Sequence, residues 1–375
     1  MDKKTFAPFA GPLYVMLKPV GATCNLRCRY CYYLGKRRLY PGEGKMAMTD
    51  ELLDIFIRQY LEAQTQPEVL FTWHGGEPLL RGIDFYRRAM SLQKKYASGR
   101  KVDNCIQTNG TLLDDEWCRF LADNNFLVGI SVDGPQALHD RYRRMHGGRP
   151  SFQKVIGGLA LLTRHKVEFN AMATVGAHNE GYPLEFYRFF KQAGIHYIQF
   201  TPLVDMIDGR PAPWSVTPAG WGDFLIAIFD EWIKHDVGKY FVQYFEATLA
   251  NWAGVQPGLC SLAKTCGHAG VMEFNGDVYS CDHFVFPGYK LGNIRSHTLT
   301  GMMYSEKQLS FGAAKQSRLH DKCKQCRYLF ACNGECPKNR ITTEKGDLNY
   351  LCPGYHNFFT HFAATATTTG TGRLI

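Results

Sequence analysis

Strand-like and helix-like segments alternate along the first 205 or so residues of this 375-residue chain. Short apolar runs rich in β-branched and aromatic residues predict strands at 13–18, 69–73, 102–108, 127–132, 167–174 and 195–201. Amphipathic patterns between them predict helices at 49–63, 83–96, 114–124, 151–165 and 184–193. Such alternation predicts an α/β fold with a parallel sheet whose functional loops follow the carboxyl ends of the strands. An open doubly wound sheet and a curled partial barrel share this pattern, and both remain alternatives at this point.

Three cysteines follow the first predicted strand directly. Cys24, Cys28 and Cys31 have C-x3-C-x2-C spacing, and the aromatic Tyr30 precedes the last of them. Three thiolates on one loop can hold three corners of an iron–sulfur cube and leave the fourth iron open to a substrate or cofactor. The alternative is three structural cysteines, but their position at a strand end favours a functional site.

The composition restricts the class of protein. Hydrophobic content of 45% and charged content of 21% are ordinary for a soluble globular protein. Residues 1–6 lack the apolar run of a secretory signal, so we expect a cytoplasmic protein, and no apolar stretch approaches the ~20 residues of a membrane span. The formal charge of +9 is spread over isolated basic pairs. This spread favours a solvated surface, or attraction for an anionic partner, over nucleic-acid binding.

Eight more cysteines lie close together near the C-terminus: Cys260, Cys266, Cys281, Cys323, Cys326, Cys332, Cys336 and Cys352. Thirteen cysteines in a chain without a secretory signal argue for metal or redox work rather than disulfides. The late eight divide into two sets of four, which fits two [4Fe–4S] clusters or two zinc sites. Little aliphatic sequence surrounds them, so we expect metal to hold that region together. Cys105 and Cys118 are expected to be small buried apolar residues.

Changes in sequence character predict four parts. Residues 1–215 contain the strand–helix alternation, and 216–255 form a helical bridge whose aromatic side chains pack as a core. Residues 256–356 form the cysteine-rich domain. Residues 357–375 contain the end of a helix and a low-complexity tail, from about residue 363, that we expect to be disordered.

The cysteine loop resembles the signature of the radical S-adenosylmethionine (SAM) enzymes. The resemblance implies a partial (β/α)6 barrel and a [4Fe–4S] cluster on Cys24, Cys28 and Cys31, with SAM chelating the open iron through its amino and carboxylate groups. Gly75-Gly76-Glu77-Pro78, after the second strand, resembles the motif that holds the SAM amino group, with Gly76 as the contact. An ordinary turn is the alternative for these four residues.

Other SAM contacts follow from the same resemblance. Ser131, at the end of the fourth strand, would bind ribose or carboxylate, while Tyr30 and Val204 would pack around adenine. The resemblance selects Arg143 for a bidentate pair with the SAM carboxylate. On residue type alone, Arg141 and Arg144 remain equal candidates.

The late cysteines resemble the twin-cluster domain called SPASM, which occurs in radical SAM enzymes that modify peptides. This resemblance divides the eight ligands between two auxiliary [4Fe–4S] clusters, which brings the expected total to three. It assigns the first cluster to Cys260, Cys266, Cys281 and Cys336, and the second to Cys323, Cys326, Cys332 and Cys352.

Taken together, these motifs resemble the anaerobic sulfatase-maturating enzymes over nearly the whole chain. Further matching sequences are Gln107-Thr108-Asn109-Gly110-Thr111, Ser131-Val132-Asp133-Gly134-Pro135, Gly276-Asp277-Val278-Tyr279 and Cys281-Asp282. These enzymes oxidise one Ser or Cys of a nascent or unfolded sulfatase polypeptide to Cα-formylglycine through a 5′-deoxyadenosyl radical. The resemblance implies that Asp282 accepts the proton, that the first auxiliary cluster accepts the electron, and that a flavodoxin- or ferredoxin-type protein supplies reducing electrons.

Two alternatives remain open at this stage. One is another SPASM-type radical SAM enzyme that crosslinks a different peptide, and the other is a zinc-stabilised nucleic-acid-binding or scaffold protein. The alternative for Asp282 is a structural role as a turn or capping aspartate. His74 stands where some relatives carry Gln, and either a contact with peptide or water, or simple packing at a strand end, would explain it. The residues do not distinguish a Ser from a Cys target.

Overall fold

The computed structural model describes residues 13–42, 44, 46–267 and 269–368, which group into two compact units. The first unit comprises Met1–Ser131, Arg143–Phe169 and Gly267–Ala313. The second comprises Val132–Tyr142, Asn170–Cys266 and Ala314–Ile375. Each unit therefore combines N-terminal and C-terminal segments.

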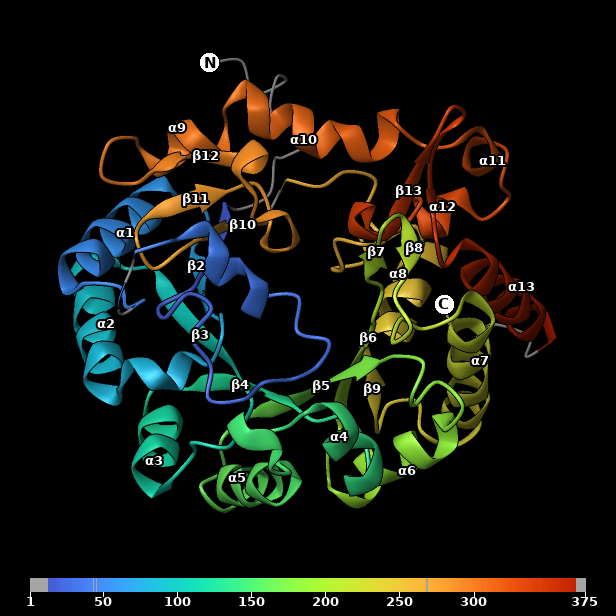
Figure 1. Ribbon diagram of the computed structural model, residues 1–375, viewed down its shortest axis with the longest axis horizontal. Coiled ribbons are helices and arrows are strands. Elements are labelled where there is room, and N and C mark those ends of the chain that lie inside the picture. The colour runs from blue at the N-terminus through green and yellow to red at the C-terminus, as the bar shows by residue number, and fades with distance from the viewer. Residues whose placement is uncertain (1–12, 43, 45, 268, 369–375) are drawn as a thin grey trace. The chain divides into compact units, whose positions relative to one another are not determined.

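The sheet of the first unit has the strand order β12-β11-β10-β1-β2-β3-β4 (Figure 1). Its strands are β1 (Tyr14–Leu17), β2 (Glu68–Trp73), β3 (Lys101–Thr108), β4 (Phe126–Ser131), β10 (Ala269–Met272), β11 (Asp277–Tyr279) and β12 (Lys290–Asn293). Strands β1 to β4 pair in parallel, and β1 pairs in parallel with β10 on its other side. Strands β10, β11 and β12 are antiparallel to one another. The parallel part brings the loops after β1, β2, β3 and β4 to one edge of the sheet.

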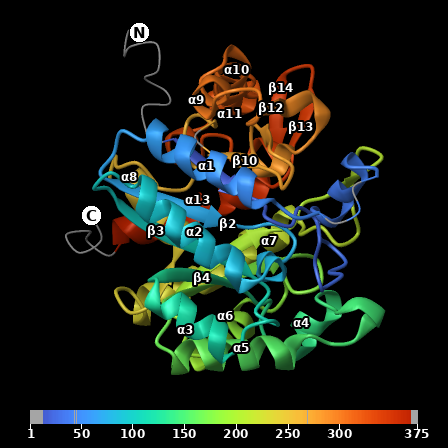
Figure 2. The same ribbon diagram turned by 90° about the vertical axis from the view of Figure 1, so that its left-hand side faces the viewer.

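Helices cover this sheet. They are α1 (Asp50–Ala63), α2 (Ile83–Tyr96), α3 (Asp115–Asp123), α5 (Phe152–Arg164), α9 (Leu299–Met303) and most of α10 (Glu306–Ser317). Figure 2 shows α1, α2 and α3 side by side outside β2, β3 and β4. Helix α1 begins where the Thr49 side chain accepts a hydrogen bond from the backbone N–H of Leu52, and its apolar stripe is buried. Short 3-10 helices occupy Leu34–Leu39 (η2), Pro78–Arg81 (η3), His146–Gly148 (η4), Asp282–Phe284 (η5) and Pro287–Tyr289 (η6).

In the second unit, β5 (Phe169–Val175, apart from its first residue), β6 (Tyr197–Pro202) and β9 (Phe241–Val242) pair in parallel. The helices are α4 (Gln136–Tyr142), α6 (Pro183–Gln192), α7 (Pro218–His235), α8 (Gln243–Trp252), α11 (Asp321–Lys324), α12 (Leu329–Cys332) and α13 (Cys352–Thr368). Two hairpins, β7 (Met206–Ile207) with β8 (Arg210–Pro211) and β13 (Arg340–Thr343) with β14 (Gly346–Asn349), and the 3-10 helix η7 (Pro337–Asn339) complete it.

The aromatic side chains of the predicted bridge form the core of the second unit. Trp221, Phe224 and Trp232 on α7 are buried, and Phe224 packs edge-on against Phe186 of α6. Helices α7 and α13 approach closely where a side chain on Gly222 would collide with the backbone of α13. The prediction that these aromatics are core residues is confirmed.

The predicted strands and helices agree with the structure to within two residues at either end. Two expectations need correction. Helix α13 continues to Thr368 and includes residues 363–368 of the expected tail, while residues 369–375 lie outside the described part of the chain. The segment that carries β10, β11 and β12 has a buried apolar core, including Val271, Met272 and Val278, so metal is not all that organises it. None of the helices in the described ranges is long and apolar enough to cross a membrane.

Candidate active site

The cysteine loop follows β1 in the first unit, and contacts from neighbouring loops hold it in place. The Sγ atom of Cys24 accepts hydrogen bonds from the Leu26 backbone N–H (3.3 Å) and from Asn109 Nδ2 (3.7 Å). Burial, together with the nearby Glu77, Cys28 and Cys31, raises the pKa of the Cys24 thiol to about 12. A cationic iron cluster would stabilise Cys24 as a thiolate despite this burial, and the C-x3-C-x2-C spacing lets Cys28 and Cys31 serve as the other two ligands.

The Gly-Gly-Glu-Pro segment lies directly against the chain that leads into Cys24. The backbone N–H of Gly76 donates to the carbonyl of Gly21 (2.8 Å), and that of Glu77 donates to the carbonyl of Thr23 (2.9 Å). A Cβ atom on Gly76 would lie 2.0 Å from the Thr23 carbonyl oxygen. Only glycine fits there, and this close approach suits a site where backbone carbonyls face a ligand.

The side chain of Glu77 ties three loops together rather than facing outward. Its carboxylate is buried and accepts hydrogen bonds from the N–H of Leu79 (3.0 Å), the hydroxyl of Thr108 (2.8 Å) and the N–H of Asn109 (2.8 Å). Burial raises its pKa to about 7, although these hydrogen bonds act in the opposite direction. Three internal donors occupy this carboxylate, so backbone carbonyls of the segment are better placed than Glu77 to accept from the SAM ammonium group.

Three further SAM-contact candidates lie in the first unit. Ser131 accepts a hydrogen bond from Gln107 Nε2 (3.0 Å). The guanidinium of Arg143 lies 5.5 Å from the centre of the Tyr30 ring, and its side chain is buried, whereas Arg144 is exposed and donates to the Gly148 carbonyl. This difference favours Arg143 as the carboxylate ligand.

The remaining candidate for the adenine contact belongs to the second unit. Val204 is buried there, and its carbonyl accepts a hydrogen bond from Lys338 Nζ (2.7 Å). Its role at adenine stays a prediction.

Asp282 belongs to a half-buried polar cluster in the first unit, built around the fully buried Lys18. The ammonium of Lys18, at the end of β1, lies 2.5 Å from Asp282 Oδ1 and 3.0 Å from His74 Nδ1, and the Tyr32 hydroxyl donates to Asp282 Oδ2. Burial alone would raise the pKa of Asp282, but the positive charge of Lys18 holds it below its ordinary value. Asp282 is therefore an ionised carboxylate one residue after Cys281, and its side chain does not cap η5.

His74 is neutral in this cluster. Its Nδ1 atom accepts from the Gly75 backbone N–H (2.7 Å) and from Lys18, so its proton resides on Nε2. Burial, and then the charge of Lys18, lowers its pKa to about 3. Simple packing at the strand end therefore does not describe His74 fully, because its Nδ1 atom also contacts the buried Lys18.

Sequence reasoning missed Lys18, Tyr32 and the neighbouring pair in which the Tyr33 hydroxyl donates to Glu273. Lys18 is completely buried, and its ammonium also lies 4.3 Å from the centre of the Tyr33 ring. A lysine at the end of a wholly apolar strand was the available signal, since lysine is almost never buried without a partner.

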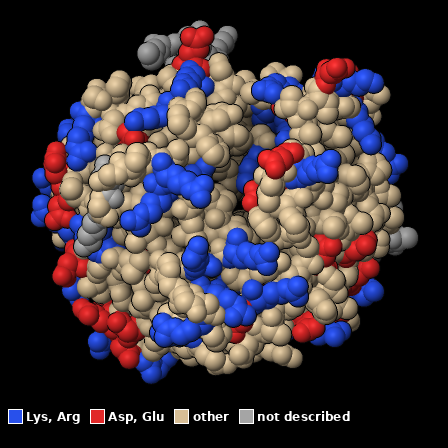
Figure 3. Space-filling view, in the orientation of Figure 1, with Lys and Arg blue, Asp and Glu red and all other residues tan. Residues whose placement is uncertain are grey.

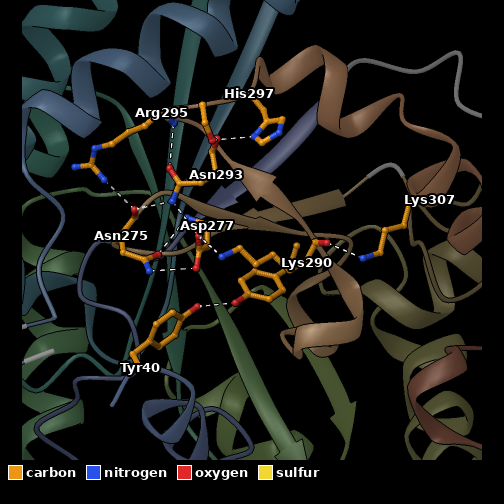
Figure 4. Close-up of polar contacts among 10 residues, drawn as sticks. Tyr40, Asn275, Asp277, Lys290, Asn293, Arg295, His297 and Lys307 are labelled. Carbon is orange, nitrogen blue, oxygen red and sulfur yellow. Dashed lines mark hydrogen bonds and ion pairs between the residues drawn. The ribbon is translucent and has the colours of Figure 1, made fainter. Parts of the chain in front are cut away.

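A polar network supports the hairpin that carries Cys281 and Asp282 (Figure 4). Asp277 on β11 pairs with Lys290 on β12 (2.7 Å) and accepts from Asn293 Nδ2 (2.9 Å), and the hydroxyls of Tyr40 and Tyr279 are 3.0 Å apart. These contacts fix the two strands that precede and follow the candidate base.

The late cysteines of the second unit fall into two neighbourhoods. Burial raises the pKa of Cys336 to about 12, with Cys260 and Cys266 contributing, and burial raises the pKa of Cys332, with Cys323 and Cys352 contributing. Burial, and then Cys326, raises the pKa of Cys352. This is the grouping that the SPASM resemblance implies, and the ligand assignments themselves remain predictions. Cys281 belongs to the first unit.

No group of three or more His, Cys, Asp or Glu side chains that could hold a metal ion is found among the described residues. Cys118 is buried, as expected, whereas Cys105 is only half-buried and lies 3.0 Å from the Thr72 hydroxyl.

Comparison with known proteins defines the class. Residues 19–190 match the Radical SAM superfamily, and residues 266–327 match the iron–sulfur cluster-binding domain SPASM. With the cysteine loop and the parallel strands, these matches define a radical SAM enzyme that depends on SAM and iron–sulfur clusters.

Full-length relatives define the family. The chain is 60% identical to a serine-type anaerobic sulfatase-maturating enzyme of Bacteroides thetaiotaomicron, over 97% of this chain and 92% of the relative. It is 33% identical to a cysteine-type enzyme of Clostridium perfringens, over 93% and 95% of the two chains. The solved structure of native anSMEcpe with bound AdoMet superposes with a TM-score of 0.88 and 32% identity, covering 96% of this chain and 100% of that one. The chain belongs to the anaerobic sulfatase-maturating enzymes.

These matches confirm the partial-barrel α/β class and decide between the alternatives left open by the sequence. They favour sulfatase maturation over a crosslinking enzyme or a zinc-stabilised binding protein. The four predicted domain boundaries stay predictions. The segments that the sequence placed in one cysteine-rich domain are shared between the two compact units.

Proposed function

We propose that this protein oxidises a serine of a sulfatase polypeptide to Cα-formylglycine, with SAM and three [4Fe–4S] clusters. The observation that carries the proposal is the ionised, half-buried Asp282, held by Lys18 one residue after Cys281. The serine-type name of the relative with 60% identity supports the choice of serine over cysteine. Eleven cysteines proposed as iron–sulfur ligands, rather than as disulfides, fit a reducing, cytoplasmic location.

The residues divide the work of holding the cofactors. Cys24, Cys28 and Cys31 would hold the cluster that binds SAM, and the eight later cysteines would hold two more clusters. When bound, SAM and its cluster would remove a hydrogen atom from the target side-chain carbon, and an auxiliary cluster would accept one electron. The Gly76 segment and Arg143 would orient the amino and carboxylate groups of SAM, and the buried position of Arg143 favours a tight charge pair.

The protein itself must then handle a proton. A serine side chain that has lost a hydrogen atom from carbon becomes an aldehyde by losing its hydroxyl proton and one further electron. Asp282 is the acceptor for this proton, because it is ionised and its ion pair with Lys18 fixes its orientation. His74 presents an Nε2–H, which can donate a hydrogen bond to an oxygen but cannot accept one.

The substrate would bind before it folds. A target side chain in a finished sulfatase core could not reach the recessed carboxylate of Asp282 without local unfolding. The solved structures of the relative anSMEcpe include complexes with the Cp18Cys and Kp18Cys peptides, which supports short peptides as test substrates.

The reaction is tested with anaerobically reconstituted protein, SAM, dithionite and three sulfatase-derived peptides that differ only in Ser, Cys or Ala at the target. We expect the Ser peptide to lose two hydrogen atoms by mass spectrometry and to react with an aldehyde probe. The Ala peptide is the control and should stay unchanged. A crosslinked product, or no change in the Ser peptide, would contradict the proposal.

The role of Asp282 is tested by Asp282→Asn. We expect the variant to cleave SAM but to form little aldehyde, so the ratio of aldehyde to 5′-deoxyadenosine falls at least ~100-fold, in the range of a lost general base. Asp277→Asn controls for a disturbed hairpin, because it weakens the contacts with Lys290 and Asn293 but keeps the carboxylate of Asp282, so its ratio should fall far less. An unchanged ratio in Asp282→Asn would remove Asp282 from the mechanism.

The number of clusters is tested by metal analysis. Three [4Fe–4S] clusters require about twelve irons per chain. Zinc in place of iron at the late cysteines would reduce this to about four and would contradict the assignment of auxiliary clusters.

A further inference from the structure

Two segments of the first unit carry positive charge without any carboxylate. Residues 13–42 contain Lys18, Arg27, Arg29, Lys36, Arg37 and Arg38 and no Asp or Glu. Residues 143–167 contain Arg143, Arg144, Arg149, Lys154, Arg164 and Lys166 and again no Asp or Glu. The basic residues look scattered along the sequence, but these two segments each carry an excess of positive charge. The fold can bring the two segments together.

Backbone contacts join these two segments at the cysteine loop. Leu26 and Met145 form an antiparallel bridge, and the N–H of Arg27 donates to the carbonyl of Arg144 (2.7 Å). His146 Nε2 lies 3.0 Å from the carbonyl oxygen of Cys24. The N–H of Met145 in turn donates to the carbonyl of Arg149 (2.9 Å), which closes the second segment into a tight loop.

The basic side chains of this junction face solvent. Arg27, Arg29, Arg144 and Arg149 are exposed, and Lys154 is exposed in the first turn of α5. Among the described residues, no carboxylate forms an ion pair with Arg27, Arg144 or Arg149. Figure 3 shows Lys and Arg side chains gathered over the region where the cysteine loop lies in Figure 1. We call Arg27, Arg29, Arg144, Arg149 and Lys154 the basic rim.

The basic rim lies at the cysteine loop, and this location indicates which kind of partner would bind there. Arg27 and Arg29 alternate with the cysteines of the loop, and Cys24, Cys28 and Cys31 are themselves half-buried rather than enclosed. A protein that docks on the rim therefore comes close to the group that these cysteines hold. Any polyanion would be attracted by the charge of the rim, but only a partner that exchanges electrons with the cluster would benefit from lying close to it.

We propose that the basic rim is the docking surface for an acidic one-electron donor protein of the flavodoxin class. In the complex the reduced donor loses one electron and the cluster on Cys24, Cys28 and Cys31 gains it. The inference rests on the proposed function, because that reaction needs an electron to start each SAM cleavage. Complementary charge speeds encounter and fixes orientation more than it adds affinity, which suits a donor that must leave after each transfer.

The test uses the reconstituted protein and a purified flavodoxin as the probe. Arg149→Glu/Lys154→Glu reverses two rim charges, and neither side chain is a cofactor contact. We expect an association rate with flavodoxin about tenfold lower at ~0.02 M salt. The difference should nearly vanish at ~0.5 M salt, where exposed charges are screened. Arg149→Lys keeps the charge and should bind like the wild type.

The matched control is Arg88→Glu/Lys94→Glu, which makes the same charge change at two exposed positions on α2. This variant should bind flavodoxin at nearly the wild-type rate. Equal losses in both double variants would mean that net charge alone matters and would overturn the docking surface. An unchanged rate in Arg149→Glu/Lys154→Glu would do the same.

Activity measured with two reductants separates this inference from the proposed function. With flavodoxin as reductant, SAM cleavage by the rim variant should fall with its association rate, whereas with dithionite it should match the wild type. Wild type that fails with dithionite contradicts the proposed function, while the binding result still judges the surface. Single-stranded RNA that binds the rim more tightly than flavodoxin does would overturn the choice of partner.

Discussion

Replacing Gly76 with alanine tests how closely two loops must approach to build the SAM site. The added Cβ would lie 2.0 Å from the Thr23 carbonyl oxygen, and real Cβ contacts essentially never fall below 3.0 Å. The loops must therefore separate by about 1 Å, which stretches the hydrogen bonds from Gly76 and Glu77, now 2.8 and 2.9 Å, beyond bonding distance. Losing two buried hydrogen bonds and straining the packing costs about 3 kcal/mol.

The same displacement moves the carbonyls that would face the SAM ammonium group. We expect SAM to bind at least tenfold more weakly to Gly76→Ala, a loss of about 1.4 kcal/mol in binding free energy. Equilibrium dialysis with reconstituted protein measures the affinity, and anaerobic urea unfolding measures the stability.

Gly35→Ala is the control for this experiment, because an added Cβ there has no neighbour within 4 Å. It should leave both quantities unchanged. If Gly76→Ala bound SAM within about twofold of the wild type and unfolded at the same urea concentration, the close approach of the two loops would not matter for the site, and the reasoning would fail.

Three other perturbations follow from the buried charges and the cysteine sets. Lys18→Met leaves the half-buried Asp282 without its cation, so we expect a loss of about 3 kcal/mol in unfolding free energy, measured by urea denaturation. Burial raises the pKa of Glu77 from 4.5 to about 7. The folded protein then holds a proton that the unfolded chain has released, so this stabilisation is complete below pH 4.5 and disappears as the pH rises through 7. Relative to Glu77→Gln, the wild type should lose about 3 kcal/mol between pH 5 and pH 8, and parallel stability curves would refute this. Cys332→Ala should remove about four irons per chain, whereas Cys118→Ala, at a buried helical position, should remove none.

Local sequence patterns predicted most of the secondary structure because each pattern is read within one element. Helix α1 has its Thr49 cap, its apolar stripe and acidic residues in the first turn, and all of these lie within fifteen residues. Helix α4, with seven residues, was missed because it is too short to show a clear period.

Contacts between segments that are distant in the sequence could not be predicted. The pairing of β1 with β10 joins residues about 250 positions apart, and the sequence of neither strand indicates which strand it pairs with. The same limit applies to the active site. Asp282 was predicted from its place beside Cys281, but its partners Lys18 and Tyr32 come from the other end of the chain. The internal role of Glu77 was missed for that reason too, since its donors include Thr108 and Asn109 on the next loop.

The pairing of β1 between β2 and β10 has a consequence for synthesis of the protein on the ribosome. At about 5–20 residues per second, the chain needs roughly 10–50 s to extend from β1 to β10. Throughout that interval β1 has one unpaired edge, and Lys18 at its end has no Asp282 to neutralise it. The cysteine loop after β1 is therefore exposed before its surroundings are complete. Insertion of the cluster into this loop can precede or follow the pairing of β1 with β10. Strands β2, β3 and β4 pair with strands that are adjacent in the sequence, whereas β1 and β10 are far apart, so we expect β1 to close on β10 after the other three have paired.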